Sequence, residues 1–199
     1  MDFYDVVERR RSIRSFAPTP VPDDVVARAL KAAQRSPSPL NSQPWRFIVL
    51  NGQARDTICS IVAGSSRLLE DLLPLVDPAV IEQAVRFFSD LGGAPTVIVV
   101  TLPRFTADYD RKVALLAVGG AVNVLQHALA AEGVGSVCVT SAVWVEERIR
   151  SDLGLENDEF ATVIPIGYPA APPATPVERE DKVLRLDVWP RAAEGRSSG

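Results

Sequence analysis

The chain has 199 residues, of which 47% are hydrophobic and 23% are charged, a balance typical of one ordinary globular domain. Its net charge of -4 argues against a nucleic-acid-binding protein, because such proteins are usually basic. The single histidine rules out a histidine-based metal cluster, and the two cysteines, Cys59 and Cys138, lack a CxxC partner, so we expect two buried free thiols.

The first third of the chain alternates helical patterns with proline-rich segments. In chain order we expect a helix over residues 2–10, a helix over 23–34, a loop over 36–44, a strand over 45–50 and helices over 54–64 and 66–73. Asp23 and Asp24 open the second helix, where acidic side chains favour the positive end of the helix dipole. Three prolines prevent regular structure in the loop.

The rest of the chain places strands around one long helix. In chain order we expect a helix over 78–91, a strand over 95–102, a helix over 111–132, a strand over 134–140, a helix over 145–153, a strand over 160–167, a proline-rich arm from about residue 168 and a last strand over 183–188. Pro165 indicates an edge or a bulge in its strand. We expect one domain over residues 1–190 and a disordered tail over 191–199.

The long helix includes an apolar stretch over residues 113–131 that has the composition of a membrane span. Because it contains Asn123, Gln126 and His127 and is short for a bilayer crossing, we expect a core or interface helix, and no membrane partner. The arm has no partner strand of its own, so pairing with another subunit would satisfy its backbone groups. The first residues lack an apolar signal segment, which favours the cytoplasm.

Known nucleotide-binding motifs do not account for the chain. It contains no GxxxxGK[ST] loop, and Gly133-Val134-Gly135 follows a helix and precedes a strand, the reverse of a dinucleotide fingerprint. A Rossmann-type nicotinamide domain is therefore not expected.

Two segments carry candidate binding chemistry. In RRRSIRSF, residues 9–16, the side chains of Arg10, Ser12 and Arg14 alternate and can point to one side together, where guanidinium groups bind phosphate in bidentate fashion. A solvated basic patch beside a helix end is the alternative. In SPSPLNSQPW, residues 36–45, the prolines stiffen a loop that holds backbone donors and Asn41 in place, or that simply leads into the strand.

Taken together, these motifs resemble the nitroreductase family. RRSIRSF and NSQPW are followed by the Ala/Gly-rich long helix, then GVGSVCVTS and PIGYPAAPP, and the resemblance runs from Phe3 to about Val188. It implies an α+β fold with a central, mainly antiparallel sheet flanked by helices. It also implies a domain-swapped homodimer, with two FMN molecules at the subunit interface.

The resemblance assigns four residues near the N-terminus to FMN binding: Arg10, Arg11, Ser12 and Arg14. Arg10 is expected to hold the phosphate, and Ser12 to bond phosphate or ribityl oxygens. Arg14 is expected beside the pyrimidine edge, where a cation stabilises negative charge on the reduced flavin.

The resemblance also assigns the proline-rich loop to the flavin of the other subunit. Pro37, Ser38 and Pro39 are expected to reach that flavin, and Asn41 and Gln43 to fix the loop or to bond the flavin directly. Pro39 stands where many relatives have a small hydroxyl residue, so one hydrogen bond is lost.

Later in the chain, the backbone N–H groups of Thr140 and Ser141 are expected to approach the hydride-accepting nitrogen of the flavin. Arg179 best matches the second phosphate ligand of the family, with Arg185 as the alternative. The segment between Leu102 and Arg111 is short, so the lid over the flavin is expected to be reduced. Phe87, Phe88, Phe105 and Tyr109 are the aromatic candidates for a substrate wall, although core packing is favoured for the first two.

The activity that the resemblance implies is oxidoreduction without a catalytic side chain. NAD(P)H would reduce FMN and leave, and a nitroaromatic, a quinone or a similar acceptor would then take its place, in a ping-pong cycle. The alternatives are a dehydrogenase of the same fold acting on a biosynthetic intermediate, or a non-catalytic flavin-binding protein. No metal and no nucleic-acid partner is expected.

Overall fold

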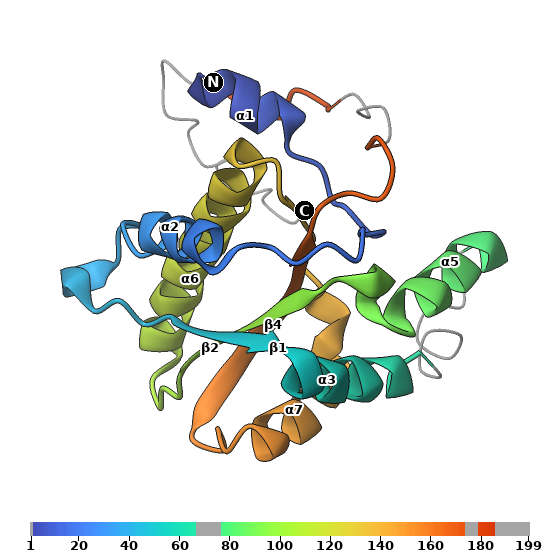
Figure 1. Ribbon diagram of the computed structural model, residues 1–199. Coiled ribbons are helices and arrows are strands. Elements are labelled where there is room, and N and C mark those ends of the chain that lie inside the picture. The colour runs from blue at the N-terminus through green and yellow to red at the C-terminus, as the bar shows by residue number, and fades with distance from the viewer. Residues whose placement is uncertain (1, 67–76, 174–178, 186–199) are drawn as a thin grey trace, which may run out of the picture.

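The protein is an α+β structure built on one antiparallel sheet (Figure 1). The computed structural model describes residues 2–66, 77–173 and 179–185. The strand order is β1-β2-β4-β3, with β1 at Arg46–Asn51, β2 at Thr96–Pro103, β3 at Gly135–Ser136 and β4 at Asp158–Gly167. The implied fold class is therefore confirmed.

Helices cover both faces of the sheet. Helices α2 (Asp23–Ala33) and α6 (Asp108–Ala131) lie on one face, and α3 (Gly52–Gly64), α5 (Pro78–Phe88) and α7 (Glu146–Asp152) belong to the other layer (Figure 1). In β2, Val97 and Val99 pack into the second layer, whereas Ile98 and Val100 pack against α2 and α6. Because side chains of a strand alternate between faces, this burial on both sides explains the continuous apolar run in the sequence.

The third strand is much shorter than the expected 134–140, and Pro165 explains the difference. The Val139 N–H donates to the Val163 carbonyl over 2.8 Å, so the backbone groups of Val163 face the β3 side of β4. Since these groups alternate along a strand, Pro165 faces the same side and has no N–H to offer. Regular pairing with β3 is confined to Gly135–Ser136, and the bridge at Val139 follows. Pro165 therefore lies in an inner strand, beside an interruption of the pairing.

The other expected elements occur with shifted ends. Helix α1 covers Phe3–Arg9, α5 ends at Phe88, and α6 begins at Asp108, three residues earlier than expected. Short 3-10 helices add η1 (Pro39–Asn41), η2 (Leu91–Gly93) and η3 (Thr140–Val145). The expected helix over 66–73 lies outside the described residues except for Ser66, which is in a turn.

The C-terminal expectations are tested only in part. Residues 183–185 form no strand, and residues 186–188 of the expected last strand lie outside the described chain. The domain limits of 1–190, and the tail over 191–199, stay predictions.

The segment over residues 12–17 connects three distant parts of the fold. The Ile13 N–H donates to the Ser136 carbonyl over 3.1 Å, and the Phe16 N–H donates to the Gly92 carbonyl over 2.9 Å. The arm pairs with the same segment, because the Ala170 N–H donates to the Ser15 carbonyl over 3.0 Å. This segment therefore docks on β3, on η2 and on the start of the arm.

Helix α6 is long and apolar enough, by length and composition, to cross a membrane. It has a different role in this fold, where eight of its residues are buried, among them Leu125 and Leu129 against the sheet. Its remaining surface is also apolar in part: Leu116 is 80% exposed, and a Cβ on Gly119 or Gly120 would meet nothing within 4 Å. The expectation of a core or interface helix agrees with this packing.

Candidate functional site

Two pockets flank the segment 12–17, and each contains part of the arginine motif. The larger, here called the strand-end pocket, has a volume of about 430 Å³ and opens where the chain leaves β3. Its lining residues are Arg14, Val80, Gln83, Ala84, Phe87, Phe88, Val137, Cys138, Val139, Thr140 and Ser141. A pocket of this volume suits a small organic ligand.

The smaller pocket, here called the arginine pocket, has a volume of about 130 Å³ and contains the N-terminal part of the motif. It is lined by Arg9, Arg10, Arg11, Ile13, Gln126, Ala130, Gly133, Val134, Gly135, Ser136, Pro169 and Pro173. No carboxylate is in this lining, and none of the four motif arginines forms an ion pair with another described residue. The pocket is therefore cationic, and guanidinium groups in this state suit a phosphate group.

The two pockets are close enough to hold the two ends of one ligand. Arg10 lines the arginine pocket and Arg14 the strand-end pocket, and four residues of extended chain span at most ~14 Å. Ser12 lies between them and forms a parallel bridge with Ser136. This arrangement fits an elongated molecule with an anionic end and a planar, apolar end.

Two glycines allow the motif to dock this closely. A Cβ on Gly135 would lie 2.7 Å from the Cγ1 atom of Ile13, and a Cβ on Gly92 would overlap the carbonyl oxygen of Arg14. Gly92 also has a φ of +68°, in the left-handed region that favours glycine. Sequence reasoning missed the role of Gly92, because its partner lies almost eighty residues away, by the numbering of Arg14 and Gly92.

Thr140 and Ser141 line the strand-end pocket, and their approach to a flavin stays a prediction. They are the first two residues of η3, and N–H groups at the start of a helix have no partner within that helix. These donors are available to a ligand in the pocket.

The two cysteines differ in how deeply they are buried. Cys59 is buried, as expected, and desolvation raises the pKa of its thiol to about 11. The expectation of burial is wrong for Cys138, which is half-buried and lines the strand-end pocket, with its Sγ 3.1 Å from the Thr162 hydroxyl. The apolar neighbours of Cys138 in the sequence, Val137 and Val139, are themselves buried, but the strand has already lost regular pairing at this position.

The proline-rich loop contributes no residue to either pocket within one chain. The Gln43 N–H donates to the Ser38 hydroxyl over 2.9 Å, and the Gln43 side-chain amide donates to the Asn41 carbonyl over 3.4 Å. Leu40, Asn41 and Gln43 have positive φ angles, so the loop has a specific conformation. Pro37 and Pro39 are exposed. A single chain therefore does not bring these residues to the arginine motif.

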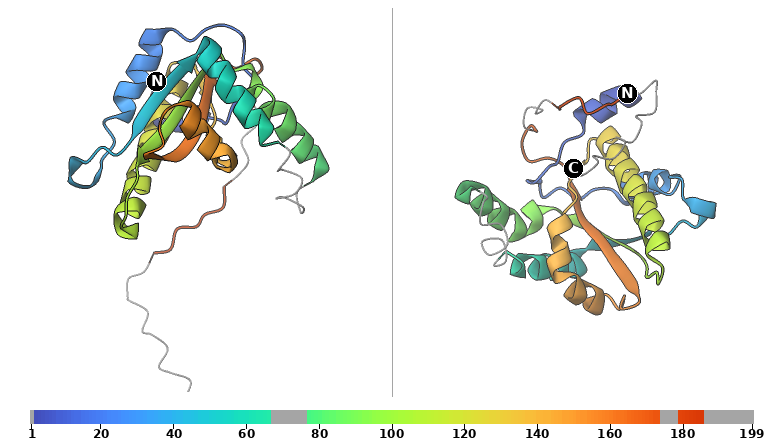
Figure 2. Two further views of the ribbon diagram at one scale, coloured as in Figure 1. Left: turned by 90° about the horizontal axis from the view of Figure 1, so that it is seen from below. Right: turned by 180° about the vertical axis from the view of Figure 1, so that it is seen from behind.

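Arg179 and Arg185 are also separate from the motif. Both are exposed, in a segment that extends away from the body of the protein (Figure 2). The choice between them as a phosphate ligand stays open.

The four aromatic candidates for a substrate wall do not lie together. Phe87 and Phe88 are buried in the core and also line the strand-end pocket. Phe105 lines a third pocket, and Tyr109 is 74% exposed. Sequence reasoning missed Val80, Gln83 and Ala84 of α5, which complete the wall beside Phe87, because only the tertiary fold brings α5 to the end of β3.

The fold and the two pockets define a class of protein: an α+β ligand-binding protein in which an N-terminal arginine motif docks on the edge of an antiparallel sheet. Comparison with known proteins identifies its family. The model of the nitroreductase family matches residues 7–168, and the chain belongs to that family.

Three relatives illustrate the similarity. A putative NAD(P)H nitroreductase of Bacillus subtilis is 27% identical over 172 residues, covering 85% of each chain. An iodotyrosine deiodinase of Thermotoga neapolitana is 29% identical, covering 94% of this chain and 98% of the relative. A putative nitroreductase from Desulfovibrio desulfuricans, solved in complex with FMN, is 25% identical with a TM-score of 0.73, covering 96% of this chain and 99% of that one.

Proposed function

We propose that this protein is an FMN-dependent oxidoreductase, which uses NAD(P)H to reduce a nitroaromatic, a quinone or a similar acceptor. The observation that carries the proposal is the pair of pockets on either side of residues 12–17, one cationic and small, the other larger and partly apolar. When bound, FMN accepts a hydride from the donor and passes it to the acceptor. Location in the cytoplasm stays a prediction.

The residues present fit an FMN molecule. Arg10 and Arg11 would hold its phosphate in the arginine pocket, which contains no competing carboxylate, and Ser12 would bond the phosphate or the ribityl chain. Arg14 would stabilise negative charge beside the ring, and the N–H groups of Thr140 and Ser141 would donate to the ring edge. Gly92 and Gly135 leave the space that this arrangement needs.

The donor and the acceptor would use the strand-end pocket in turn, which gives ping-pong kinetics. The names of relatives support the donor, since the Bacillus subtilis protein is described as an NAD(P)H nitroreductase. No side chain is needed as an acid or base, because protons can come from solvent.

We further propose that the protein is a homodimer that completes each site. Helix α6 exposes Leu116 and the bare backbone of Gly119 and Gly120, a surface suited to close packing against a second copy. In such a dimer, the loop containing Pro37, Ser38, Pro39, Asn41 and Gln43 would reach the flavin of the partner. The arm would supply Arg179, or Arg185, to a phosphate.

A second candidate function is reductive dehalogenation of a halogenated phenol. It is favoured by the iodotyrosine deiodinase of Thermotoga neapolitana, whose identity and coverage are as high as those of the nitroreductase relative. A dehydrogenase of the same fold and a non-catalytic flavin-binding protein are the further alternatives.

The experiment is direct. The purified protein is examined for flavin absorbance, the flavin is released by denaturation and identified, and the FMN-loaded protein is mixed anaerobically with NADH or NADPH. We expect bleaching of the flavin by at least one donor and return of the colour with a nitroaromatic or a quinone. Colour that returns only with 3-iodotyrosine supports the second function, and protein that cannot be loaded with FMN refutes both.

A further inference from the structure

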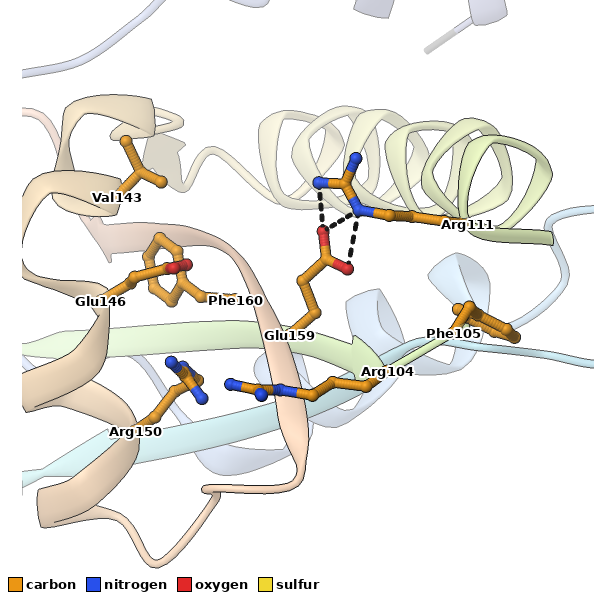
Figure 3. A pocket seen from close by; sticks show the side chains of 8 residues that line it. All are labelled: Arg104, Phe105, Arg111, Val143, Glu146, Arg150, Glu159 and Phe160. Carbon is orange, nitrogen blue, oxygen red and sulfur yellow. Dashed lines mark hydrogen bonds and ion pairs between the residues drawn. The ribbon is translucent and has the colours of Figure 1, made fainter. Parts of the chain in front are cut away.

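A third pocket lies apart from the two described above, between the start of α6, η3, α7 and the first residues of β4 (Figure 3). It has a volume of 380 Å³ and is here called the Arg104–Arg150 pocket. Its lining residues are Arg104, Phe105, Arg111, Val143, Glu146, Arg150, Glu159 and Phe160. None of them was assigned to the flavin.

Arg150 is a buried cation that forms no ion pair within the described part of the chain. Its side chain comes from the last turn of α7, and the residue is only 9% exposed. Its Nη1 atom donates to the carbonyl oxygens of Glu156 and Asp158, over 3.2 and 3.3 Å, and its Nε atom has no hydrogen-bond partner among the described residues. Burial of a charge in this state is costly, because only neutral carbonyl dipoles oppose it.

The carboxylates of Asp158 and Glu159 are already engaged. The Asp158 carboxylate accepts from Arg46 over 2.8 Å and from the Thr101 hydroxyl over 2.7 Å. Glu159 pairs with Arg111 on α6, with a shortest distance of 2.6 Å. Neither carboxylate is available to neutralise Arg150.

Arg104 adds a second cation to the same space. Its Nε atom donates to the Asp158 carbonyl over 3.2 Å, the same carbonyl that Arg150 contacts, and its guanidinium points toward that of Arg150 (Figure 3). Arg104 forms no ion pair with any described residue. Glu146 is the remaining acid in the lining, and it too is without an ion pair in the described part of the chain.

We propose that the Arg104–Arg150 pocket binds a small organic molecule through an oxyanion, a carboxylate or a phosphate, held between the two guanidinium groups. An oxyanion there would relieve the repulsion between two like charges that share one carbonyl. Phe105, Val143 and Phe160 supply apolar contacts for the rest of the molecule, and Glu146 can accept a hydrogen bond from it. The volume is sufficient, because about 150 Å³ holds a benzene ring.

The test uses benzoate as the probe and benzamide as its neutral counterpart, by isothermal titration calorimetry on protein saturated with FMN, so that the flavin pockets are filled. We expect benzoate to bind, benzamide to bind at least about tenfold more weakly, and the flavin absorbance to stay unchanged. Phenyl phosphate, titrated in parallel, shows which of the two oxyanions is preferred.

Two variants locate the binding. Arg104→Gln removes an exposed guanidinium that makes one hydrogen bond, so the fold is retained, and we expect benzoate affinity to fall about tenfold. Arg148→Gln is the matched control, because Arg148 lies on α7, the helix that carries Arg150, has a 70% exposed side chain and pairs with Asp152. Equal binding of benzoate and benzamide, absence of benzoate binding, or binding that survives Arg104→Gln and perturbs the flavin spectrum would overturn the proposal. Since FMN loading is measured separately, these outcomes do not depend on the proposed oxidoreductase activity.

Discussion

Arg14 and Gly92 pack so closely that the carbonyl oxygen of Arg14 occupies the space where a side chain on residue 92 would begin. The contact is reinforced by the hydrogen bond from the Phe16 N–H to the Gly92 carbonyl. It fixes the backbone of Arg14 at the edge of the strand-end pocket. The position of this arginine is therefore set by the glycine turn after α5.

Substitution Gly92→Ala should reduce both stability and FMN content. The added Cβ meets backbone atoms of Arg14, and the φ of +68° at residue 92 disfavours alanine. We therefore expect a loss of more than about 2 kcal/mol in the free energy of unfolding. Thermal and urea denaturation measure it. Gly64→Ala is the control, because a Cβ there meets nothing within 4 Å; equal effects of the two variants would contradict the close contact.

Substitution Arg10→Gln should weaken FMN binding. Loss of one hydrogen bond between charged groups, worth about 1.5–3 kcal/mol, raises the dissociation constant about tenfold to a hundredfold. Titration of flavin fluorescence measures this constant. Arg86→Gln serves as control, since Arg86 is exposed on α5 and pairs with Glu82. An unchanged constant for Arg10→Gln would place the phosphate elsewhere.

The two thiols should differ in reactivity at pH 8. With the pKa of Cys59 raised to about 11 by burial, only about 0.1% of this thiol is ionised at that pH, whereas Cys138 lines a pocket. We expect iodoacetamide to label Cys138 first, as measured by mass spectrometry of peptides, and bound FMN to slow the labelling. Faster labelling of Cys59 than of Cys138 would contradict the burial seen here.

Substitution Asp158→Asn should destabilise the fold. Asp158 is 7% exposed and joins Arg46 on β1, whose side chain is 56% exposed, to Thr101 on β2, so removal of its charge weakens two hydrogen bonds to a buried carboxylate. We expect a loss of about 2 kcal/mol in the free energy of unfolding, measured by urea denaturation. Asp24→Asn, at an exposed pair with Arg28 on one helix, should change it by less than about 0.5 kcal/mol.

Substitution Leu116→Glu should separate the proposed dimer. A charge on the exposed apolar face of α6 opposes packing against a second copy, and FMN content should fall with dimerisation because the partner loop is then lost. Analytical ultracentrifugation with flavin absorbance measures both. Thr57→Glu, on the exposed side of α3, should leave the assembly intact. A monomeric unsubstituted protein that still binds FMN would reject the shared site.

The sequence predicts those parts of the fold that depend on local pattern. The β-branched run of β2 and the long helix α6 occur close to their expected limits, because burial on both faces and helical length both leave clear signals. The third strand ends well before its expected limit, because its length depends on Pro165 in a different strand. Arg14, Thr140 and Ser141 line one pocket, and their contact with FMN stays a prediction.

Other site features could not be predicted from local pattern. Arg150 donates to backbone carbonyls and shares a pocket with Arg104. Neither relationship can be recognised from the sequence, because both depend on the tertiary fold. The loop residues Asn41 and Gln43 line neither pocket that contains part of the arginine motif, so the role proposed for them requires a second copy.

The backbone pairing of Ser15 with Ala170 bears on biosynthesis. The arginine motif precedes Ala170 by more than 150 residues, so one of the segments that anchors it is made much later in translation. Closure of so long a loop is slow. The pairing of Ser15 with Ala170 can therefore form only after residue 170 has emerged from the ribosome, later than the contacts of the same segment with Gly92 and Ser136.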